Sequence, residues 1–231
     1  MKLPQRTGEP MDETSPPPGL LSGLTDHQRE VALQRAERRD FAANQVIVHS
    51  GAPATRLFQL TKGAAKFYRV TKNGDEVLLW WLASGDIFGV GALLARPWHY
   101  IGTAQAVEDC ELLVWSRDNL RSLGAVYELM TANALHIAMS ALAEYTDRVV
   151  ESMGESAEQR LARTLVHVAH RSGKVGPEGV DVTLTNEDLG GLANVSMFTA
   201  SRLMKKWERE GLIEKTRGKI RIFSPDNLVA T

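Results

Sequence analysis

Cysteine is almost absent from the 231-residue chain, which contains only Cys110. One thiol cannot form a disulfide within the chain, and it cannot supply the several cysteine ligands of an iron–sulfur cluster or a cysteine-rich zinc site. We therefore expect no iron–sulfur cofactor. We expect Cys110 to act as a small buried hydrophobe.

Long apolar runs are also missing. No run of about 18 apolar residues occurs, and no short apolar segment follows an N-terminal charge cluster. These absences predict a cytoplasmic protein without a membrane span or a secretory signal. Large apolar residues are scarce in residues 1–19, where prolines and scattered charges dominate, and this composition predicts a disordered tail.

Residues 20–116 have the spacing of a small β-barrel or sandwich. We expect a short helix from Asp26 to Glu37, capped by the Thr25 hydroxyl, and strands after it. Glycines recur in this stretch 12, 11 and 11 residues apart, at Gly51, Gly63, Gly74 and Gly85. The runs between them are apolar or alternating, as is typical of short strands joined by turns.

One hairpin of this barrel is signalled by Asn73-Gly74, which separates the runs 65–70 and 77–82. The second run does not alternate, so we expect both of its faces to be covered. Large aromatics of the barrel, Trp80, Trp81 and Tyr100 among them, either line a ligand pocket or fill the core.

Residues 117–156 have the pattern of a long helix. Leu135, Leu142 and Val149 recur every seven residues, and Ala138 and Tyr145 form a parallel series. Such a stripe is typical of a coiled-coil seam, so we expect the helix to pair with a second copy. The alternative is that the stripe packs on the chain's own sheet domain. A further helix, 157–170, leads into the last domain.

Residues 184–211 predict two short helices joined by a sharp turn. Thr185 with Asp188 forms a capping box for the first helix, and Ser196 offers an N-cap for the second. Asn194 tolerates the left-handed conformation that such a turn requires, and Gly211 is a C-terminal stop. This arrangement is typical of a DNA-reading helix-turn-helix.

The second of these helices has one apolar and one polar face, and a basic hairpin follows it. Ala200, Leu203, Met204 and Trp207 have inward-facing spacing. From Ser196 to Phe223 eight basic residues stand against three acidic ones, a local net charge of +5 in a chain whose net charge is -1. The runs 212–216 and 219–223 flank Arg217-Gly218, a hairpin signal that completes a winged helix-turn-helix. The alternative is a merely solvated basic face.

The order of these parts resembles the cyclic-AMP receptor protein and FNR (Crp/Fnr) superfamily of bacterial transcription regulators. The resemblance covers nearly the whole chain from about Leu20. It is carried by Gly51, Gly63, Gly74-Asp75-Glu76, Gly85-Asp86-Ile87-Phe88-Gly89, Leu93-Leu94, Ser196 and Arg202.

The resemblance implies an α+β fold with three parts: a double-stranded β-helix (jelly-roll) sensor domain at 20–116, a dimerisation helix at 117–156 and a winged helix-turn-helix at 157–231. It further implies a homodimer on a near-palindromic operator, controlled by a small-molecule, gas or redox signal. RNA polymerase is a further partner that the resemblance allows, and no membrane partner is expected.

The effector site departs from the family pattern. Members that bind a cyclic nucleotide place a glutamate and an arginine-serine pair where this chain has Val90, Tyr100 and Ile101. Without its bidentate arginine a buried cyclic phosphate lacks its strong partner, so cyclic AMP is disfavoured. The pocket candidates are Trp80, Trp81, Gly89, Val90, Tyr100 and Ile101.

The histidines give little support to a haem site or to catalysis. His49, His99 and His136 are candidates for a haem ligand, although no spacing singles one out, and the effector stays unidentified. Barrel dioxygenases and isomerases require converging histidines and a carboxylate. Only His49 and His99 fall in the barrel region, so we expect no enzyme. A regulator that binds DNA without any effector remains an open alternative.

The predicted DNA contacts centre on Arg202, which matches the family's base-contacting arginine, with Ser201 beside it. Many members place Arg-Glu where this chain has Met197-Phe198, so the preferred operator should differ. Phe198 either touches a thymine methyl or packs against the first helix. The predicted contact residues are Thr185, Ser196, Met197, Phe198, Thr199, Ser201, Arg202, Lys205, Lys206, Lys215, Arg217 and Lys219, of which the lysines, Arg217 and Thr199 are expected at phosphates.

Overall fold

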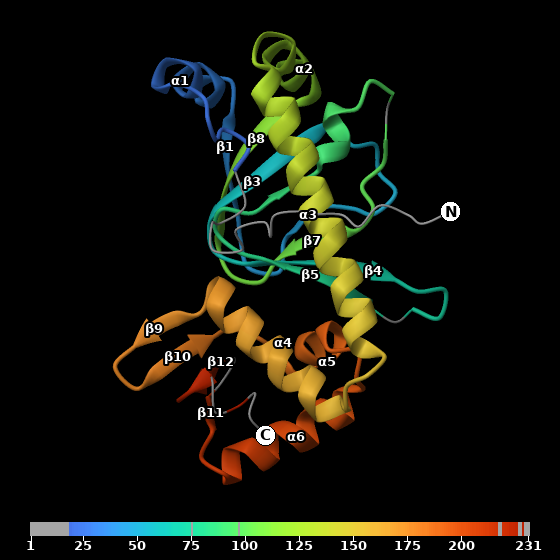
Figure 1. Cartoon of the computed structure of the whole chain (residues 1–231), viewed down its shortest axis with the longest axis vertical. Coiled ribbons are helices and arrows are strands. Elements are labelled where there is room, and N and C mark those ends of the chain that lie inside the picture. Colours follow the sequence, from blue (N-terminus) through green and yellow to red (C-terminus); the bar gives the residue numbers. More distant parts are fainter. Residues whose placement is uncertain (1–18, 75, 97, 217–218, 226–227, 229–231) are drawn as a thin grey trace, which may run out of the picture.

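The computed structural model describes residues 19–74, 76–96, 98–216, 219–225 and 228 (Figure 1). The predicted disordered tail, except Gly19, and the predicted phosphate contact Arg217 lie outside these residues. No helix in the described ranges is long and apolar enough to cross a membrane.

The N-terminal domain consists of two four-stranded antiparallel sheets with a core between them. One sheet has the order β1-β8-β3-β6 and the other β2-β7-β4-β5. Phe58, Leu60 and Val114 from the first sheet pack with Phe67 and Ala104 from the second. The strands are β1 (Glu37–Phe41), β2 (Val46–Val48), β3 (Arg56–Lys62), β4 (Ala65–Val70), β5 (Glu76–Leu82), β6 (Ile87–Phe88), β7 (Thr103–Ala106) and β8 (Cys110–Ser116).

The local signals for this domain are largely confirmed. Gly51, Gly63, Gly74 and Gly85 all have left-handed backbone conformations, as the turn spacing requires. Thr25 caps the first helix, α1 (Asp26–Gln34), with Gln28 completing the capping box. The helix is shorter than expected because Glu37 already begins β1, whose register pairs it with Val114 of β8.

The hairpin β4–β5 forms where Asn73-Gly74 predicts it, and a register shift explains why β5 does not alternate. Phe67 pairs with Trp80, whereas Tyr68 pairs with Leu78, so Leu79 is an extra residue in the strand. This bulge directs Leu78 and Trp81 to the outer face of the sheet, where they join the core of the C-terminal domain. Both faces of β5 are therefore covered, as expected.

Cys110 is buried, as its isolation in the sequence suggests. Its thiol donates to the Ala64 carbonyl at 3.2 Å. Burial raises the pKa of the Cys110 thiol to about 11, so at neutral pH the side chain is an uncharged thiol with little nucleophilic character.

The expected continuous helix from 117 to 156 is instead two helices, α2 (Arg117–Val126) and α3 (Glu128–Ser152), separated at Tyr127. The break lets Leu120 and Leu123 of α2 join a core cluster with Leu20 and Met130. The residue at the break, Tyr127, is not a helix breaker such as glycine or proline, so it gives no local sign of the break. Between β6 and β7 a short 3₁₀ helix, η1 (Val90–Leu93), packs near this cluster.

Helix α3 runs from the barrel to the C-terminal domain (Figure 1). Several apolar side chains of this helix are exposed. Leu135 and Leu142 are 65% and 55% exposed, and Val149 is exposed as well. Leu135 and Leu142 therefore do not pack on the chain's own sheet domain. The second series differs from the expected one, because Ala138 is half-buried and the Tyr145 ring lies 5.8 Å from that of Trp80. Met139 of α3 and Met153, which directly follows the helix, are further exposed apolar residues.

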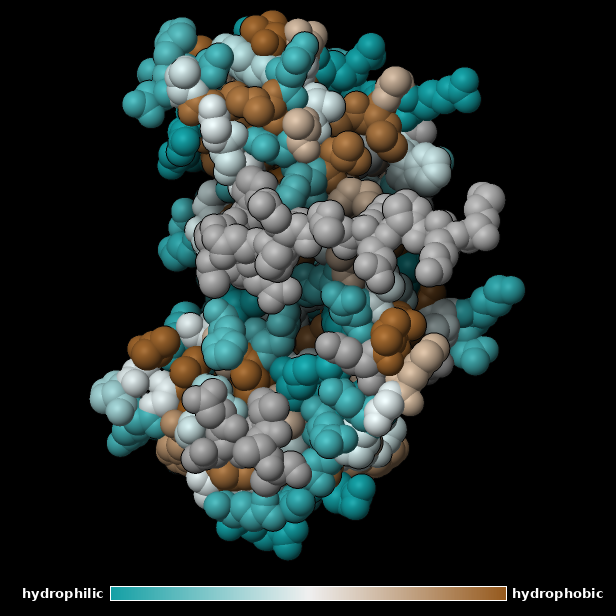
Figure 2. Space-filling view, viewed as in Figure 1, coloured by the Kyte–Doolittle hydropathy of each residue, from teal (hydrophilic) through white to brown (hydrophobic). Residues whose placement is uncertain are grey.

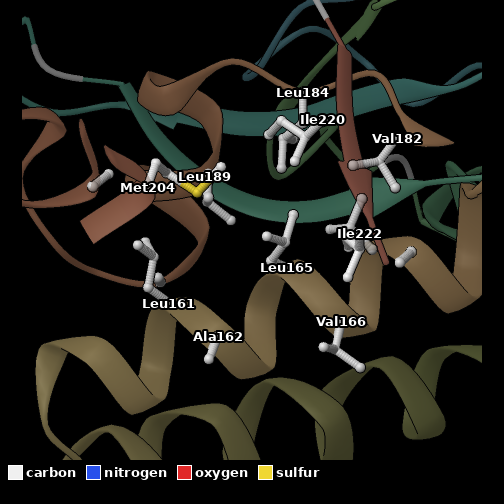
Figure 3. Packing of buried hydrophobic residues seen from close by; sticks show 14 of the residues in the cluster. Leu161, Ala162, Leu165, Val166, Val182, Leu184, Leu189, Met204, Ile220 and Ile222 are labelled. Carbon is white, nitrogen blue, oxygen red and sulfur yellow. The ribbon is translucent and has the colours of Figure 1, made fainter. Parts of the chain in front are cut away.

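The C-terminal domain packs three helices on a four-stranded sheet of order β11-β12-β10-β9. Figure 3 shows leucines of α4 packed with residues of α5, α6 and this sheet. The hairpin β9–β10 was not predicted from the sequence. The elements are α4 (Ala157–Ser172), β9 (Lys174–Gly176), β10 (Gly179–Val182), α5 (Asn186–Leu192), α6 (Met197–Arg209), β11 (Ile213–Thr216) and β12 (Lys219–Ile222).

One hydrophobic core cluster contains residues of both domains. Tyr68, Leu78 and Trp81 on the outer face of β4 and β5 pack with Leu161 and Leu165 of α4. Polar contacts border this cluster. The Trp81 indole N–H donates to Ser172 at 3.0 Å, Arg171 pairs with Asp86, and Lys66 lies 3.7 Å from Asp188.

We predict that Gly190→Ala destabilises the C-terminal domain. A methyl group on Gly190 would lie 2.9 Å from the Val195 carbonyl oxygen, which the tight turn holds in place. Overpacking of this kind costs about 1–3 kcal/mol. Thermal denaturation should show a lower Tm, whereas the control Gly154→Ala, whose methyl meets nothing within 4 Å, should melt like the wild type. An unchanged Tm for Gly190→Ala would show that the turn can relax.

Candidate nucleic-acid interface

Helices α5 and α6 begin and end where their caps require. The Thr185 hydroxyl accepts from the Asp188 N–H at 3.0 Å, and the Ser196 hydroxyl accepts from the Thr199 N–H at 3.1 Å. Asn194 in the turn has φ of 52°, and Gly211 after α6 has φ of 71°. The predicted caps and turn are confirmed, and they fix α6 as a separate helix with an exposed N-terminus.

Helix α6 lies at the end of the molecule farthest from the barrel, and this end is predominantly hydrophilic (Figures 1 and 2). Its inner face, Ala200, Leu203, Met204 and Trp207, is buried as predicted. The outer face carries exposed Arg202 and Lys205, with Thr199 and Ser201 half-buried beside them. A shallow groove on this face is lined by Phe198, Ser201, Arg202, Lys205, Glu208 and Arg209.

The structure decides between the two positions considered for Phe198. The side chain is 80% exposed, so it does not pack against α5. Met197 before it is 48% exposed. Both side chains project from the first turn of α6, the part of a recognition helix that meets base edges in helix-turn-helix proteins.

Several of the basic residues are already engaged within the chain. Lys206 pairs with Glu158 of α4 at 2.7 Å, and Lys215 donates to Asn186 at 2.9 Å. Arg221 lies among Asp181, Glu178 and Glu214 on the sheet. The local net charge of +5 therefore overstates the free positive charge. Arg202, Lys205 and Lys219 keep exposed side chains.

Sequence reasoning missed two residues of α4 that hold the reading unit in place. Arg160 donates to the carbonyls of Ala193 and Asn194 in the turn at 3.0 and 3.3 Å, and to the carbonyl of Glu155 at 2.8 Å. The Glu158 carboxylate accepts from the Trp207 indole at 3.1 Å as well as from Lys206. The helical pattern of α4 gives no sign that Arg160 and Glu158 have partners so far away in the sequence.

The effector-pocket candidates do not converge on one cavity. Trp80 packs against the barrel core and Tyr145, but Trp81 faces the C-terminal domain instead, because adjacent residues of a strand point to opposite faces. Ile101 is 54% exposed at the surface. Trp81 and Ile101 therefore do not belong to the predicted pocket.

The remaining candidates lie around the turn between β6 and η1. Gly89 is left-handed, and a methyl group there would lie 2.6 Å from the Arg56 carbonyl. Val90 begins η1 and is half-buried. Tyr100 is buried, and its hydroxyl both donates to the Arg56 carbonyl and accepts from the Arg56 N–H. Backbone and side chains thus occupy the space around these residues.

The haem-ligand candidates His49, His99 and His136 are all exposed and belong to no buried apolar cluster of the described residues. Their surroundings do not fit an apolar haem pocket. Within the described ranges, no group of three or more histidine, cysteine, aspartate or glutamate side chains is placed to hold a metal ion.

Comparison with known proteins matches both domains. The cyclic nucleotide-binding domain family matches residues 38–127, and the Crp-like helix-turn-helix domain family matches residues 159–231. The electron transport regulator A of Shewanella oneidensis is 25% identical over 189 residues, which cover 81% of this chain and 72% of the relative. The cAMP-activated global transcriptional regulator CRP of Pasteurella multocida is 24% identical over 190 residues, 81% of this chain and 90% of the relative.

The fold agrees with these matches. The solved structure of FixK2 from Bradyrhizobium japonicum has a TM-score of 0.72 at 18% identity, covering 84% of this chain and 95% of that one. The chain belongs to the Crp/Fnr superfamily of bacterial transcription regulators.

As a Crp/Fnr regulator the chain is a DNA-binding protein, and the helix-turn-helix is the part that binds DNA. The barrel departs from a cyclic nucleotide site, because Val90, Tyr100 and Ile101 supply no cation for a cyclic phosphate. The nearby Arg117 guanidinium donates instead to the carbonyls of Ala92 and Leu94 at 3.1 and 2.6 Å. These residues do not fit a cyclic nucleotide.

We predict that Glu158→Gln loosens α6 at neutral pH. Hydrogen bonds from Lys206 above all hold the pKa of the Glu158 carboxyl below its usual 4.5. A depressed folded-state pKa adds stability that is present above the unfolded value and is lost as the pH falls through the folded value. The variant should therefore melt lower than the wild type at pH 7, and the two should converge in acid.

Thermal unfolding followed by circular dichroism at several pH values measures this difference. Glu210→Gln is the matched control, since Glu210 is the residue that caps the C-terminus of α6, lies 4.0 Å from Lys206 and is exposed. It should change the melting little. A Glu158→Gln deficit that persisted at acidic pH would show that the effect is not the ion pair.

Proposed function

We propose that this Crp/Fnr regulator acts as a homodimer that reads a near-palindromic operator with two copies of α6. The observation that carries the proposal is the polar outer face of α6, where exposed Arg202 and Lys205 stand on a helix anchored by buried Trp207. Recognition helices with this arrangement enter successive major grooves, one in each half-site.

The contacts divide by chemistry. Arg202 is the residue for guanine, because a guanidinium can donate to both O6 and N7. Lys205 and Lys219 meet phosphates, and the exposed N-caps Thr185 and Ser196 place the positive ends of α5 and α6 toward the backbone of DNA. Lys206 and Lys215 contribute less directly, since both already have partners within the chain.

The dimer is supported by the exposed stripe of α3. Leu135, Met139 and Leu142 form it, each more than half exposed. A helix whose apolar stripe stays uncovered by its own chain gains stability by pairing with a second copy. The two copies of α6 are then held at a fixed separation, which a palindromic site requires.

Control by a signal is supported by the contacts that join barrel, α3 and the C-terminal domain. Arg148 of α3 donates to the carbonyl of the bulged Leu79 at 2.5 Å. Glu144 of α3 lies 3.4 Å from His167 and 3.7 Å from Arg171 of α4. A signal that moves β5 against α3 therefore reaches α4 through side chains in direct contact. We propose a signal other than cyclic AMP.

A regulator that holds one DNA-competent form without an effector is the alternative, and it is supported by the filled interior of the barrel. The two are separated by measuring operator affinity with and without the small molecules that copurify with the protein. A change in affinity supports a sensor, whereas equal affinities support the fixed form. Enzymatic activity is not proposed, and neither is a contact surface for RNA polymerase.

We predict that Arg202→Ala relaxes specificity at one base pair. The variant should lose about 1–3 kcal/mol of binding free energy to operators with guanine at that position, and discriminate little among bases there. Binding to a panel of operators with single substitutions measures this. Lys205→Ala is the comparison, since loss of a phosphate contact weakens all operators alike. Unchanged guanine preference in Arg202→Ala would refute the assignment.

We predict that Leu142→Glu breaks the dimer. A carboxylate in the middle of the stripe would be buried against its own copy, a costly placement for an unpaired charge. Sedimentation should show a monomer, and operator affinity should fall because only one half-site is held at a time. His136→Glu is the control, on an exposed part of α3 outside the stripe. A dimeric Leu142→Glu protein would place the interface elsewhere.

A further inference from the structure

Phe198 is the large apolar side chain that stands out on the reading surface. It is 80% exposed, whereas Ala200, Leu203 and Met204 of the same helix are buried. It contributes nothing to the core of its own domain. Met197 beside it is 48% exposed, and adjacent apolar side chains left in water among polar ones are typical of a surface that meets a partner.

The neighbours of Phe198 identify that partner as DNA. Phe198 and Arg202 are four residues apart, so they lie on one face of α6, and both line the same shallow groove. Lys205, Glu208 and Arg209 also line this groove, so that with Arg202 three cations stand against one carboxylate. A groove with cations on one side suits a polyanion, and a protein partner would have to cover these charges as well.

The chemistry of the major groove limits what the ring can read. Phenylalanine has no hydrogen-bonding group, so it cannot recognise guanine, adenine or cytosine by donors and acceptors. The apolar group that bases present in the major groove is the 5-methyl of thymine. A phenyl ring in contact with this methyl removes both from water, and deletion of one buried methyl costs a factor of about four in affinity.

We propose that Phe198 reads the 5-methyl group of a thymine one or two base pairs from the guanine that Arg202 reads. This inference rests on the proposed function. The spacing follows from geometry, since four residues of helix advance about 6 Å and one base-pair step about 3.4 Å. In each half-site the protein thereby recognises two positions, a thymine and a guanine that lies one or two base pairs away.

The test begins with selection of bound duplexes from a random library. It uses full-length protein, with and without the low-molecular-weight fraction of the cells that produced it. The selected half-sites should contain a thymine at that distance from a fixed guanine. Uracil then replaces this thymine, which deletes the methyl and leaves every donor and acceptor in place. Wild-type affinity should fall about threefold to tenfold.

The variant Phe198→Ala should bind thymine and uracil operators with equal affinity, while it keeps its preference for guanine. Arg202→Ala should show the reverse pattern. Because Phe198 is exposed, Phe198→Ala should melt like the wild type. Val175→Ala is the matched control, since Val175 is 86% exposed on β9 at the far edge of the sheet from β11. It should retain full discrimination between thymine and uracil.

A second duplex set tests for the methyl itself. Cytosine replaces the thymine, with and without a 5-methyl group. The methylated cytosine should bind wild type more tightly than plain cytosine, and this gain should vanish in Phe198→Ala.

The outcomes separate the two claims. A wild type that selects guanine-containing sites but ignores uracil substitution would overturn the role of Phe198 alone. The same holds if Phe198→Ala keeps full thymine discrimination. A wild type that selects no sequence in either condition would overturn the proposed function and this inference with it.

Discussion

The outer face of the β4–β5 hairpin is apolar, and the rest of the structure depends on the requirement that it be covered. Tyr68, Leu78 and Trp81 lie on that face, and the helices of the DNA-binding domain bury them. An apolar surface of this kind is costly to leave in water. The position of the reading helix is therefore fixed by the same contact that covers the barrel, and one core cluster spans both domains beside the barrel's own core.

Charge alone is a poor guide to how this chain meets DNA. The net charge of -1 conceals a basic C-terminal region, yet much of that basic character is spent within the domain. Arg221 and Lys206 neutralise acidic neighbours. Arg148 on α3, whose pKa is lowered by burial, is likewise not available to contact DNA. What remains on the outer face of α6 is a small set of exposed cations around one exposed ring. Specificity in such an interface depends more on shape and on apolar contact than on total charge.

Sequence reasoning succeeded where the physics is local. The caps at Thr185 and Ser196 and the left-handed turn at Asn194 each depend on residues within four positions, and the structure has them. The inward face of α6 followed from its periodicity, and the strand spacing of the barrel followed from its glycines.

Features that depend on distant residues were not predictable in this way. The break at Tyr127 arises because α2 turns to bury Leu120 and Leu123, not because of a helix-breaking residue. The extra residue Leu79 in β5 places Leu78 on the same outer face as Trp81, although three positions separate them. The anchoring role of Arg160 requires knowledge of which carbonyls approach it, and no pattern in the sequence encodes that approach.

The guanidinium of Arg160 has a consequence for how movement travels through the molecule. It bonds at once to the backbone of Glu155, in the joint between α3 and α4, and to the backbone of the turn before α6. These bonds tie the joint to that turn, so a movement of the joint acts on the turn directly. We expect a small rotation of the long helix to displace the turn together with the joint, with the guanidinium as the link between them.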